Sequence, residues 1–145
     1  MRLPKQMLII PYTKEDDKVL YCIFKRKDLG FYQFISGGCE DFDKDTEDSA
    51  KRELFEETGI KDISLEKLEI ETMIPVVNIR KDFFWGKDVF YAKEYVYAVN
   101  ITGKDIILSD EHSEYKFGSY EEIKKHLKYD SNKSALWELN EKLIR

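Results

Sequence analysis

The sequence predicts a single α+β domain, residues 1–145, in which a mixed β-sheet lies between helices on both of its faces. The chain has 145 residues, the length of one domain with one sizeable core. Hydrophobic residues make up 42% of the chain and aromatic residues 14%, a composition typical of a packed globule. Strands are expected first, then one helix, further strands and finally more helices, and this order favours a sheet covered on both faces.

Three strands are expected before the first helix. Apolar, β-forming runs occupy residues 6–12 and 18–24, and the polar TKEDD between them is typical of a turn. A third run, FYQFIS at 31–36, is expected to end at Gly37 and Gly38. We expect the backbone to pass close to another group there, because glycine has no side chain in the way.

The first helix is expected to begin near Asp45 and to end at Gly59. Asp45 or the following threonine can accept a hydrogen bond from the first turn. Asp48 lies in this turn, where the positive end of the helix dipole favours a negative charge. Gly59 can adopt the left-handed conformation that ends helices, and Ile60 would then pack back against the last turn.

The second half of the chain is expected to add two strands and two helices. Residues 65–77 and 88–101 are rich in β-forming residues, with a loop at 78–87 between them. A helix at 119–127 opens with a serine and a glutamate at capping-box spacing. A last helix at 132–144 carries an apolar stripe formed by Ala135, Leu136, Leu139 and Leu143.

Charge and composition restrict the partners and the location. With 24 basic and 29 acidic residues, the chain lacks the positive surface that polymeric nucleic acid requires. A small polyanionic substrate remains compatible with this charge, because a metal ion can supply the positive charge. Cys22 and Cys39 are too far apart for a zinc or redox motif, which favours reduced thiols and a cytoplasmic location. No apolar run approaches the roughly 18 residues of a membrane span, so no membrane is expected as a partner.

The first helix carries an acidic cluster. Glu53, Glu56 and Glu57 are three and four residues apart, so they share one helix face although like charges repel there. Three carboxylates form a hard-oxygen site that suits Mg²⁺, with Mn²⁺ as a substitute. The commoner origin of such a cluster is a solvated charged face. Arg52 favours the site, because its guanidinium can hold a carboxylate in place.

A resemblance to a known family emerges from these residues. The stretch GGCEDFDKDTEDSAKRELFEETGI at 37–60 resembles the Nudix box, Gx5Ex7REUxEExGU, in which U is a bulky aliphatic residue. Lys44 stands where the first glutamate of the box is expected, and because it lies outside the REUxEE core we expect it to tune the site. The matching positions are Gly38, Arg52, Glu53, Leu54, Glu56, Glu57, Gly59 and Ile60.

The resemblance to the MutT-like Nudix hydrolases implies a fold and an activity. The family shares an αβα sandwich with a mixed sheet, in agreement with the expected order of elements. Its members are mostly magnesium-dependent pyrophosphohydrolases that act on a nucleoside diphosphate linked to another group. By this resemblance Glu53, Glu56 and Glu57 are metal ligands, and Arg52 orients the glutamates.

A second resemblance concerns the carboxy-terminal part. Residues 109–123 and 129–139 are similar to the tail of dihydroneopterin triphosphate pyrophosphatases, also described as dATP pyrophosphohydrolases. In that subfamily a segment of the EHxxYKW type brings a further glutamate to the metal site. Here it reads EHSEYKF, which makes Glu111 the corresponding residue and places Phe117 where tryptophan is found.

The catalytic base and the role of nearby residues stay open. Glu111, expected in a turn between a strand and a helix, is our first candidate for the base or for an additional metal ligand, and Glu53 is the second. His112 can polarise a phosphate, but a lone histidine at such a place is more often structural. Glu94 lies in an aromatic strand and can face either the site or solvent.

Substrate contacts are expected from aromatic and basic residues. Trp85, in a loop next to a glycine, and Tyr32 can stack on a purine or pterin ring, although most aromatic residues at strand spacing belong to the core. Arg26 and Arg80 can contact phosphates.

The leading hypothesis is a Mg²⁺-dependent pyrophosphohydrolase. It would cleave a (deoxy)nucleoside triphosphate, or dihydroneopterin triphosphate, to the monophosphate and pyrophosphate, as a monomer or homodimer. One alternative is a Nudix hydrolase of dinucleoside polyphosphates or nucleotide sugars. Another is a noncatalytic Nudix module that binds a nucleotide, which the substitution at Lys44 would favour and the intact glutamate triad disfavours.

Overall fold

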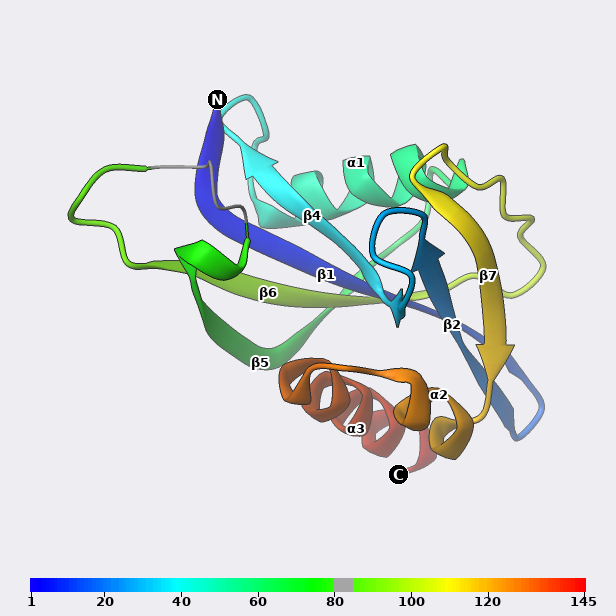
Figure 1. The fold of residues 1–145 in the computed structure, drawn as a ribbon. Helices are drawn as coiled ribbons and strands as arrows, with labels where there is room; N and C mark the ends of the chain where they lie inside the picture. The colour runs from blue at the N-terminus through cyan, green and yellow to red at the C-terminus, as the bar shows by residue number, and fades with distance from the viewer. Residues whose placement is uncertain (80–84) are drawn as a thin grey trace.

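A mixed β-sheet forms the middle layer of the molecule, with one helix on one face and two on the other (Figure 1). The structure, a computed structural model, describes residues 1–79 and 85–145. Within these residues the sheet has seven strands. The arrangement confirms the predicted α+β fold with helical layers on both sides of a mixed sheet.

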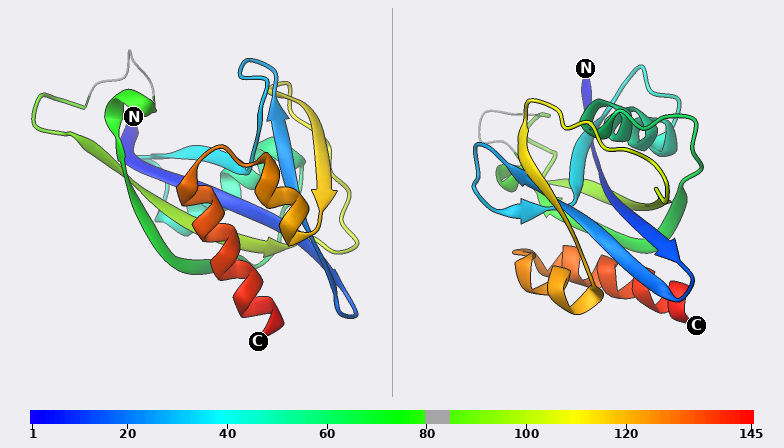
Figure 2. Two further views of the ribbon diagram at one scale, coloured as in Figure 1. Left: turned by 60° about the horizontal axis from the view of Figure 1, so that its bottom comes forward. Right: turned by 90° about the vertical axis from the view of Figure 1, so that its right-hand side faces the viewer.

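The central strand β1 organises the sheet. It pairs in antiparallel fashion with β2 and β4 and in parallel fashion with β6, so one strand contacts three others along its length (Figure 2). The main path runs β3-β2-β1-β6-β5, with β7 added to β2. The strands are β1 (Arg2–Glu15), β2 (Lys18–Arg26), β3 (Tyr32–Gln33), β4 (Ile35–Glu40), β5 (Glu66–Pro75), β6 (Tyr91–Asn100) and β7 (His112–Gly118).

The first two helices begin and end close to where local sequence signals predict, whereas the last one begins at Asp130, two residues before its predicted start. In α1 (Thr46–Thr58) the Asp45 side chain accepts a hydrogen bond from the Asp48 amide at 2.8 Å, and Gly59 ends the helix with a φ of 75°. Ser119 and Glu122 form the expected capping box. The other helices are α2 (Tyr120–His126), α3 (Asp130–Ile144) and the short 3-10 helix η1 (Val76–Asn78).

Alternate residues of the central strands build a core on each face of the sheet. Leu8 and Ile10 of β1 pack toward α2 and α3, where Ala135, Leu136 and Leu139 are buried as predicted. Met7 and Ile9 pack on the other face against α1, whose Leu54 is fully buried. This period of two fixes α1 on the opposite face of the sheet from the carboxy-terminal helices.

Two expectations about the strands were wrong. The strand predicted at 31–36 does not end at Gly37 and Gly38. Its second part, β4, continues to Glu40, because β1 starts as early as Arg2 and pairs with β4 there. A Cβ at Gly37 would collide with the Glu53 side chain and one at Gly38 with Arg2, which confirms the expected close approach. Residues 112–118, for which no strand was predicted, form β7 through pairing with β2.

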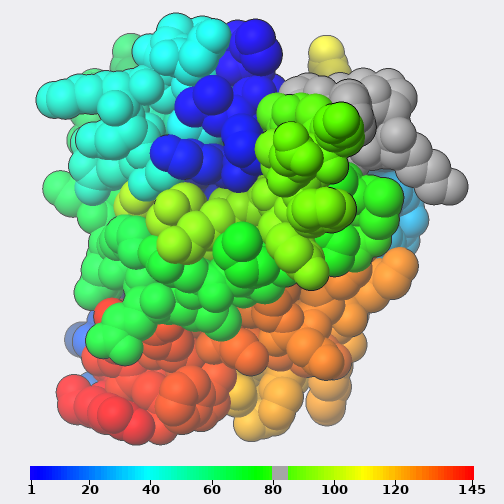
Figure 3. All heavy atoms as spheres, turned by 90° about the vertical axis from the view of Figure 1, so that its left-hand side faces the viewer, coloured from blue at the N-terminus to red at the C-terminus, as the bar shows by residue number. Residues whose placement is uncertain are grey.

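A side chain from α3 binds backbone amides of the edge strand β5. Figure 3 shows β5, in green, lying directly above α3, in orange to red. The pairing of β5 with β6 shifts register between Lys67 and Glu71, which leaves backbone amides without a strand partner. Glu138 of α3 accepts hydrogen bonds from two of them, Glu69 N at 2.6 Å and Ile70 N at 3.0 Å. No helix in the described part of the chain has the length and apolar character that a membrane crossing needs.

Candidate active site

A cavity of about 1260 Å³ extends from α1, along β4, to the start of α3. Its wall is formed by residues of the strands β1 to β6, of α1, of η1 and of the start of α3, and by the loops that precede β3, β7 and α3. Four of its lining residues are the acids Glu53, Glu56, Glu57 and Glu111. The structure therefore brings all the predicted metal-ligand residues to one cavity.

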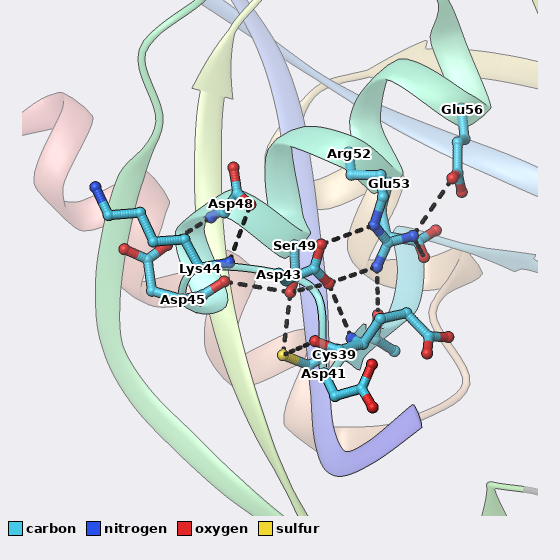
Figure 4. A network of polar contacts seen from close by, with 12 residues as sticks. Cys39, Asp41, Asp43, Lys44, Asp45, Asp48, Ser49, Arg52, Glu53 and Glu56 are labelled. Carbon is cyan, nitrogen blue, oxygen red and sulfur yellow. Dashed lines mark hydrogen bonds and ion pairs between the residues drawn. The ribbon is translucent and has the colours of Figure 1, made fainter. Parts of the chain in front are cut away.

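Arg52 connects the acidic residues of α1 to the loop before it (Figure 4). One side of its guanidinium donates to both oxygens of Asp43, from Nε at 3.1 Å and from Nη2 at 2.8 Å. The Nη1 group donates to Glu53 Oε1 at 3.1 Å and to Glu56 Oε1 at 3.4 Å. Nη2 also donates to the carbonyl oxygen of Gly38 at 3.0 Å, so the arginine is fixed from three directions.

Asp43 is a site residue that the sequence analysis missed. Its side chain is 3% exposed and accepts hydrogen bonds from Ser49 Oγ at 2.6 Å and from the Glu40 amide at 2.8 Å, in addition to those from Arg52. The hydrogen bonds from Arg52, followed by those from Ser49 and the backbone, lower the pKa of Asp43 to about 2. Asp43 is therefore a permanent anion at neutral pH.

Lys44, the position that departs from the Nudix box, does not take part in this network. Figure 4 shows its side chain pointing away from Arg52. Its backbone amide donates to Asp48 Oδ2 at 3.1 Å, which holds the loop against the start of α1. The carboxylate that anchors Arg52 thus belongs to Asp43, the residue immediately before Lys44. The one sequence signal for Asp43 as the anchor was an acid next to the position that departs from the Nudix box.

Glu53 lies between α1 and β4. Its side chain is 13% exposed and occupies the space that a Cβ at Gly37 would need. Burial, together with the charge of Glu56, raises the pKa of Glu53 to about 7, although Arg52 acts in the opposite direction. A positive charge placed between these two acids would favour the ionised form of both.

Glu57 is held by residues that precede and begin β7. Ser109 Oγ donates to Glu57 Oε2 at 2.6 Å, and His112 Nδ1 lies within ion-pair distance of the same oxygen, at 2.6 Å. Burial raises the pKa of Glu57, but the nearby histidine and the serine hydroxyl outweigh it and leave the pKa lowered. His112 is 6% exposed and packs against Phe24. Its ring contacts Glu57 but does not line the cavity.

Glu111 reaches the cavity from the loop before β7. Its carbonyl oxygen accepts from the Lys27 amide at 3.0 Å, and its own amide donates to Ser109 Oγ at 3.3 Å. These bonds fix the backbone while the side chain stays exposed. Partial burial and the charge of Glu57 raise the pKa of Glu111. The predicted proximity of Glu111 to the box helix is therefore present.

The donors fit a hard divalent cation by their chemistry. Carboxylate oxygens are the ligands that Mg²⁺ and Mn²⁺ prefer, and the predicted ligands Glu53, Glu56, Glu57 and Glu111 all line one cavity. As the side chains are placed, no three acidic, histidine or cysteine side chains within residues 1–79 and 85–145 converge on one point. The reason is visible in the contacts, because Arg52 holds Glu53 and Glu56 while Ser109 and His112 hold Glu57.

Two residues predicted to contact the substrate, Arg26 and Tyr32, differ in their position relative to the cavity. Arg26 lines the cavity and donates to both oxygens of Asp28, from Nε at 3.0 Å and from Nη2 at 2.7 Å. Tyr32 does not belong to the lining, because its ring packs edge-on against His126. Arg26 therefore remains in position to meet a substrate, whereas Tyr32 contacts neighbouring side chains.

The predicted aromatic loop is only partly described. Trp85 donates from Nε1 to the carbonyl oxygen of Arg2 at 2.8 Å and is not among the residues that line the cavity. Arg80 lies outside the described residues. The loop expected at 78–87 is described at 78–79 and at 85–87.

Polar residues of the sheet form another part of the cavity wall. Glu94, which the sequence left open between site and solvent, lines the cavity and is 3% exposed. The sequence signal for the buried position of Glu94 was strand alternation, because Glu94 lies two and four residues before Val96 and Ala98 on the buried face of β6. Other polar residues of the sheet and α3 that line the cavity include Gln6, Gln33, Ser36, Thr72 and Asn132.

Comparisons with known proteins agree with this geometry. The NUDIX domain model matches residues 3–138. A structure from Listeria monocytogenes, assigned to the NUDIX hydrolases, is 36% identical with a TM-score of 0.85, covering 97% of this chain and 94% of that one. No protein of curated function matches the chain in sequence.

Structures at lower identity share the fold. The Escherichia coli dihydroneopterin triphosphate pyrophosphohydrolase is 21% identical, with a TM-score of 0.77 and coverage of 96% of this chain and 97% of that one. A Caenorhabditis elegans Ap4A hydrolase is 21% identical, with a TM-score of 0.70 and coverage of 96% of each chain. The match over nearly the whole length and the box residues gathered at one cavity lead to one assignment: the chain belongs to the Nudix hydrolase family.

Proposed function

We propose that the protein is a metal-dependent pyrophosphohydrolase that cleaves a (deoxy)nucleoside triphosphate, or dihydroneopterin triphosphate, to the monophosphate and pyrophosphate. The observation that carries the proposal is the gathering of Glu53, Glu56, Glu57 and Glu111 around one cavity that is large enough for a nucleotide. The structural similarity to the Escherichia coli dihydroneopterin triphosphate pyrophosphohydrolase supports the choice of a triphosphate substrate.

Glu53, Glu56 and Glu57 would hold Mg²⁺, or Mn²⁺ in its place, through their carboxylate oxygens, and Glu111 is available as a further ligand or as the base. Such an ion, when bound, neutralises charge on the phosphates and makes a bound water more acidic. Arg52 donates only to Oε1 of Glu53 and of Glu56, so the other carboxylate oxygen of each remains available to a metal ion. Asp43 keeps Arg52 in place, since it occupies the opposite side of the guanidinium.

Glu111 is the proposed general base. Its side chain is exposed at the cavity, and its pKa is raised, which makes it a stronger proton acceptor than an ordinary glutamate. It would accept a proton from the water that attacks phosphorus. Glu53 is the second candidate, and Arg26 at the cavity would contact a phosphate of the substrate.

A cytoplasmic location is part of the proposal. Cys22 and Cys39 are both buried and both free, as expected for a protein that works in a reducing compartment. Burial raises the pKa of the Cys22 thiol to about 12, so this cysteine is not a reactive nucleophile.

A substrate screen with product analysis tests the proposal. The purified protein is incubated with Mg²⁺ and with nucleoside triphosphates, dihydroneopterin triphosphate, dinucleoside polyphosphates and nucleotide sugars. We expect pyrophosphate and a monophosphate from one of the triphosphates, and loss of product when the metal is chelated. Cleavage only of dinucleoside polyphosphates or nucleotide sugars would favour that alternative. Binding of a nucleotide without any product would favour the noncatalytic module.

A further inference from the structure

Glu94 is a buried acid that the proposed reaction does not use. It lies on β6 between Gln6 of β1 and Thr72 of β5, its direct partners in the two strand pairings. Paired residues of neighbouring strands project to the same face, so these three side chains form one polar row. All three line the cavity that also contains the four glutamates of the reaction site.

The carboxyl group of Glu94 has fewer hydrogen bonds than its burial calls for. Within the described residues, its side chain accepts one hydrogen bond, from Gln6 Nε2 to Oε2 at 3.2 Å. The same Gln6 amide group also donates to Ser36 Oγ at 3.0 Å, so it is shared between two acceptors. No cationic side chain in the described part of the chain forms an ion pair with Glu94, and burial raises its pKa to about 7. The carboxyl group of a glutamate that is only 3% exposed normally finds several donors.

A ligand that satisfies the Glu94 carboxylate has to supply hydrogen-bond donors. An ionised carboxylate offers only acceptors, and it pairs best with two parallel N–H groups. The 2-amino-4-oxopyrimidine ring, common to guanine and the pterins, presents a ring N–H beside an exocyclic amino group. Adenine presents one donor beside one acceptor, and hypoxanthine lacks the amino group. The ring with two adjacent donors is therefore the best match.

We propose that Glu94, positioned by Gln6, is the specificity-determining residue that binds the 2-amino-4-oxopyrimidine edge of the substrate. This inference rests on the proposed function, because the triphosphate has to occupy the glutamate end of the same cavity for the ring to reach β6. Gln33, which is 9% exposed and also lines the cavity, is available for further polar contacts to the ring.

Binding of monophosphate products in the absence of metal tests the inference independently of catalysis. Isothermal titration calorimetry compares GMP and dihydroneopterin monophosphate with IMP and AMP. We expect one or both of the amino-substituted compounds to bind about ten- to a hundredfold more tightly than IMP and AMP. The stronger of the two identifies whether the ring belongs to a guanine nucleotide or to a pterin.

The isosteric variant Glu94→Gln supplies the second measurement. It exchanges one acceptor oxygen for an amide nitrogen, and it should reduce the preference over IMP to about twofold or less. Glu71→Gln is the matched control, because Glu71 is adjacent to Thr72 on β5, pairs with Lys67 and Lys93, and is absent from the cavity lining. This control should keep the wild-type preference.

The outcomes separate this inference from the proposed function. Equal binding of all four monophosphates by the wild-type protein would overturn the role of Glu94, even if triphosphates are hydrolysed. A preference that persists in a folded Glu94→Gln variant would also overturn it. Should that variant fail to fold, the wild-type comparison still decides. A clear preference for the amino-substituted ring, combined with no hydrolysis of any triphosphate, would support Glu94 and reject the pyrophosphohydrolase.

Discussion

Replacing Asp43 by asparagine tests how strongly the Arg52 network supports the fold and the reaction. In the folded protein, hydrogen bonds from Arg52 lower the pKa of Asp43 from 3.8 to about 2. At about 1.4 kcal/mol per pKa unit this difference amounts to about 2.5 kcal/mol at neutral pH. Because the Arg52 side chain is 23% exposed and solvent screens the pair, we expect Asp43→Asn to lower the free energy of unfolding by about 1–2 kcal/mol.

The direction of the pKa shift gives the sign of the pH dependence. The pKa of Asp43 is lower in the folded protein, so its stabilising contribution is fully present above about pH 4. The contribution is lost as the pH falls toward about 2, where the carboxylate becomes protonated in the folded state. Urea unfolding should therefore separate the wild type from Asp43→Asn at pH 7, and the two free energies should converge below about pH 4.

The same variant should affect catalysis. Without its anchor, Arg52 loses the two bonds that fix one side of the guanidinium, and Glu53 is no longer held by a rigid partner. Misplacement of this kind lowers kcat by up to about a hundredfold. Asp41→Asn is the control, since Asp41 is 54% exposed and pairs with the amino terminus. If Asp43→Asn matches this control in both unfolding and kcat, Arg52 orients the glutamates without Asp43 and our interpretation fails.

Two further substitutions test the glutamate side of the cavity. Glu57→Gln should abolish turnover and weaken Mg²⁺ activation while its thermal unfolding stays close to that of Glu71→Gln, because Ser109 still has an oxygen to donate to. Undiminished hydrolysis by Glu57→Gln would contradict the site assignment. Gly37→Ala should lower kcat by about tenfold or more, since the added methyl group would displace the Glu53 side chain. A Mg²⁺ titration of the reaction rate measures this effect, and a wild-type curve would show that the position of Glu53 is unimportant.

Features that depend on residues within one or two turns could be predicted from the sequence. The start of α1 depends on Asp45 and its end on Gly59, and both act through hydrogen bonds to the adjacent backbone. The capping box of α2 and the buried stripe of α3 are equally local. Three acids spaced along one helix also share a face by helix geometry alone, so their shared face could be predicted from their spacing.

Features that depend on pairing between distant segments could not be predicted. The strand β7 is exposed at residues 113–115 and forms because β2 offers it a free edge. Asp43 acquires its role because the loop between β4 and α1 folds its carboxylate against Arg52, nine residues away. The alternation with Val96 and Ala98 places Glu94 on the buried face of β6, but its place in the cavity depends on the pairing with Gln6 of β1.

The acidic cluster on α1 also shows why a site of this kind needs support from outside the helix. Arg52 compensates part of the repulsion by bonding Glu53 and Glu56, but it is itself balanced by Asp43 on its other side. The net charge of the network therefore stays negative, and the raised pKa of Glu53 reflects its burial and, after that, the repulsion from Glu56. For stability alone, neutral side chains of similar size would serve as well or better. The arrangement gains a physical purpose when a cation enters the cavity, because that charge stabilises the same carboxylates that destabilise each other without it.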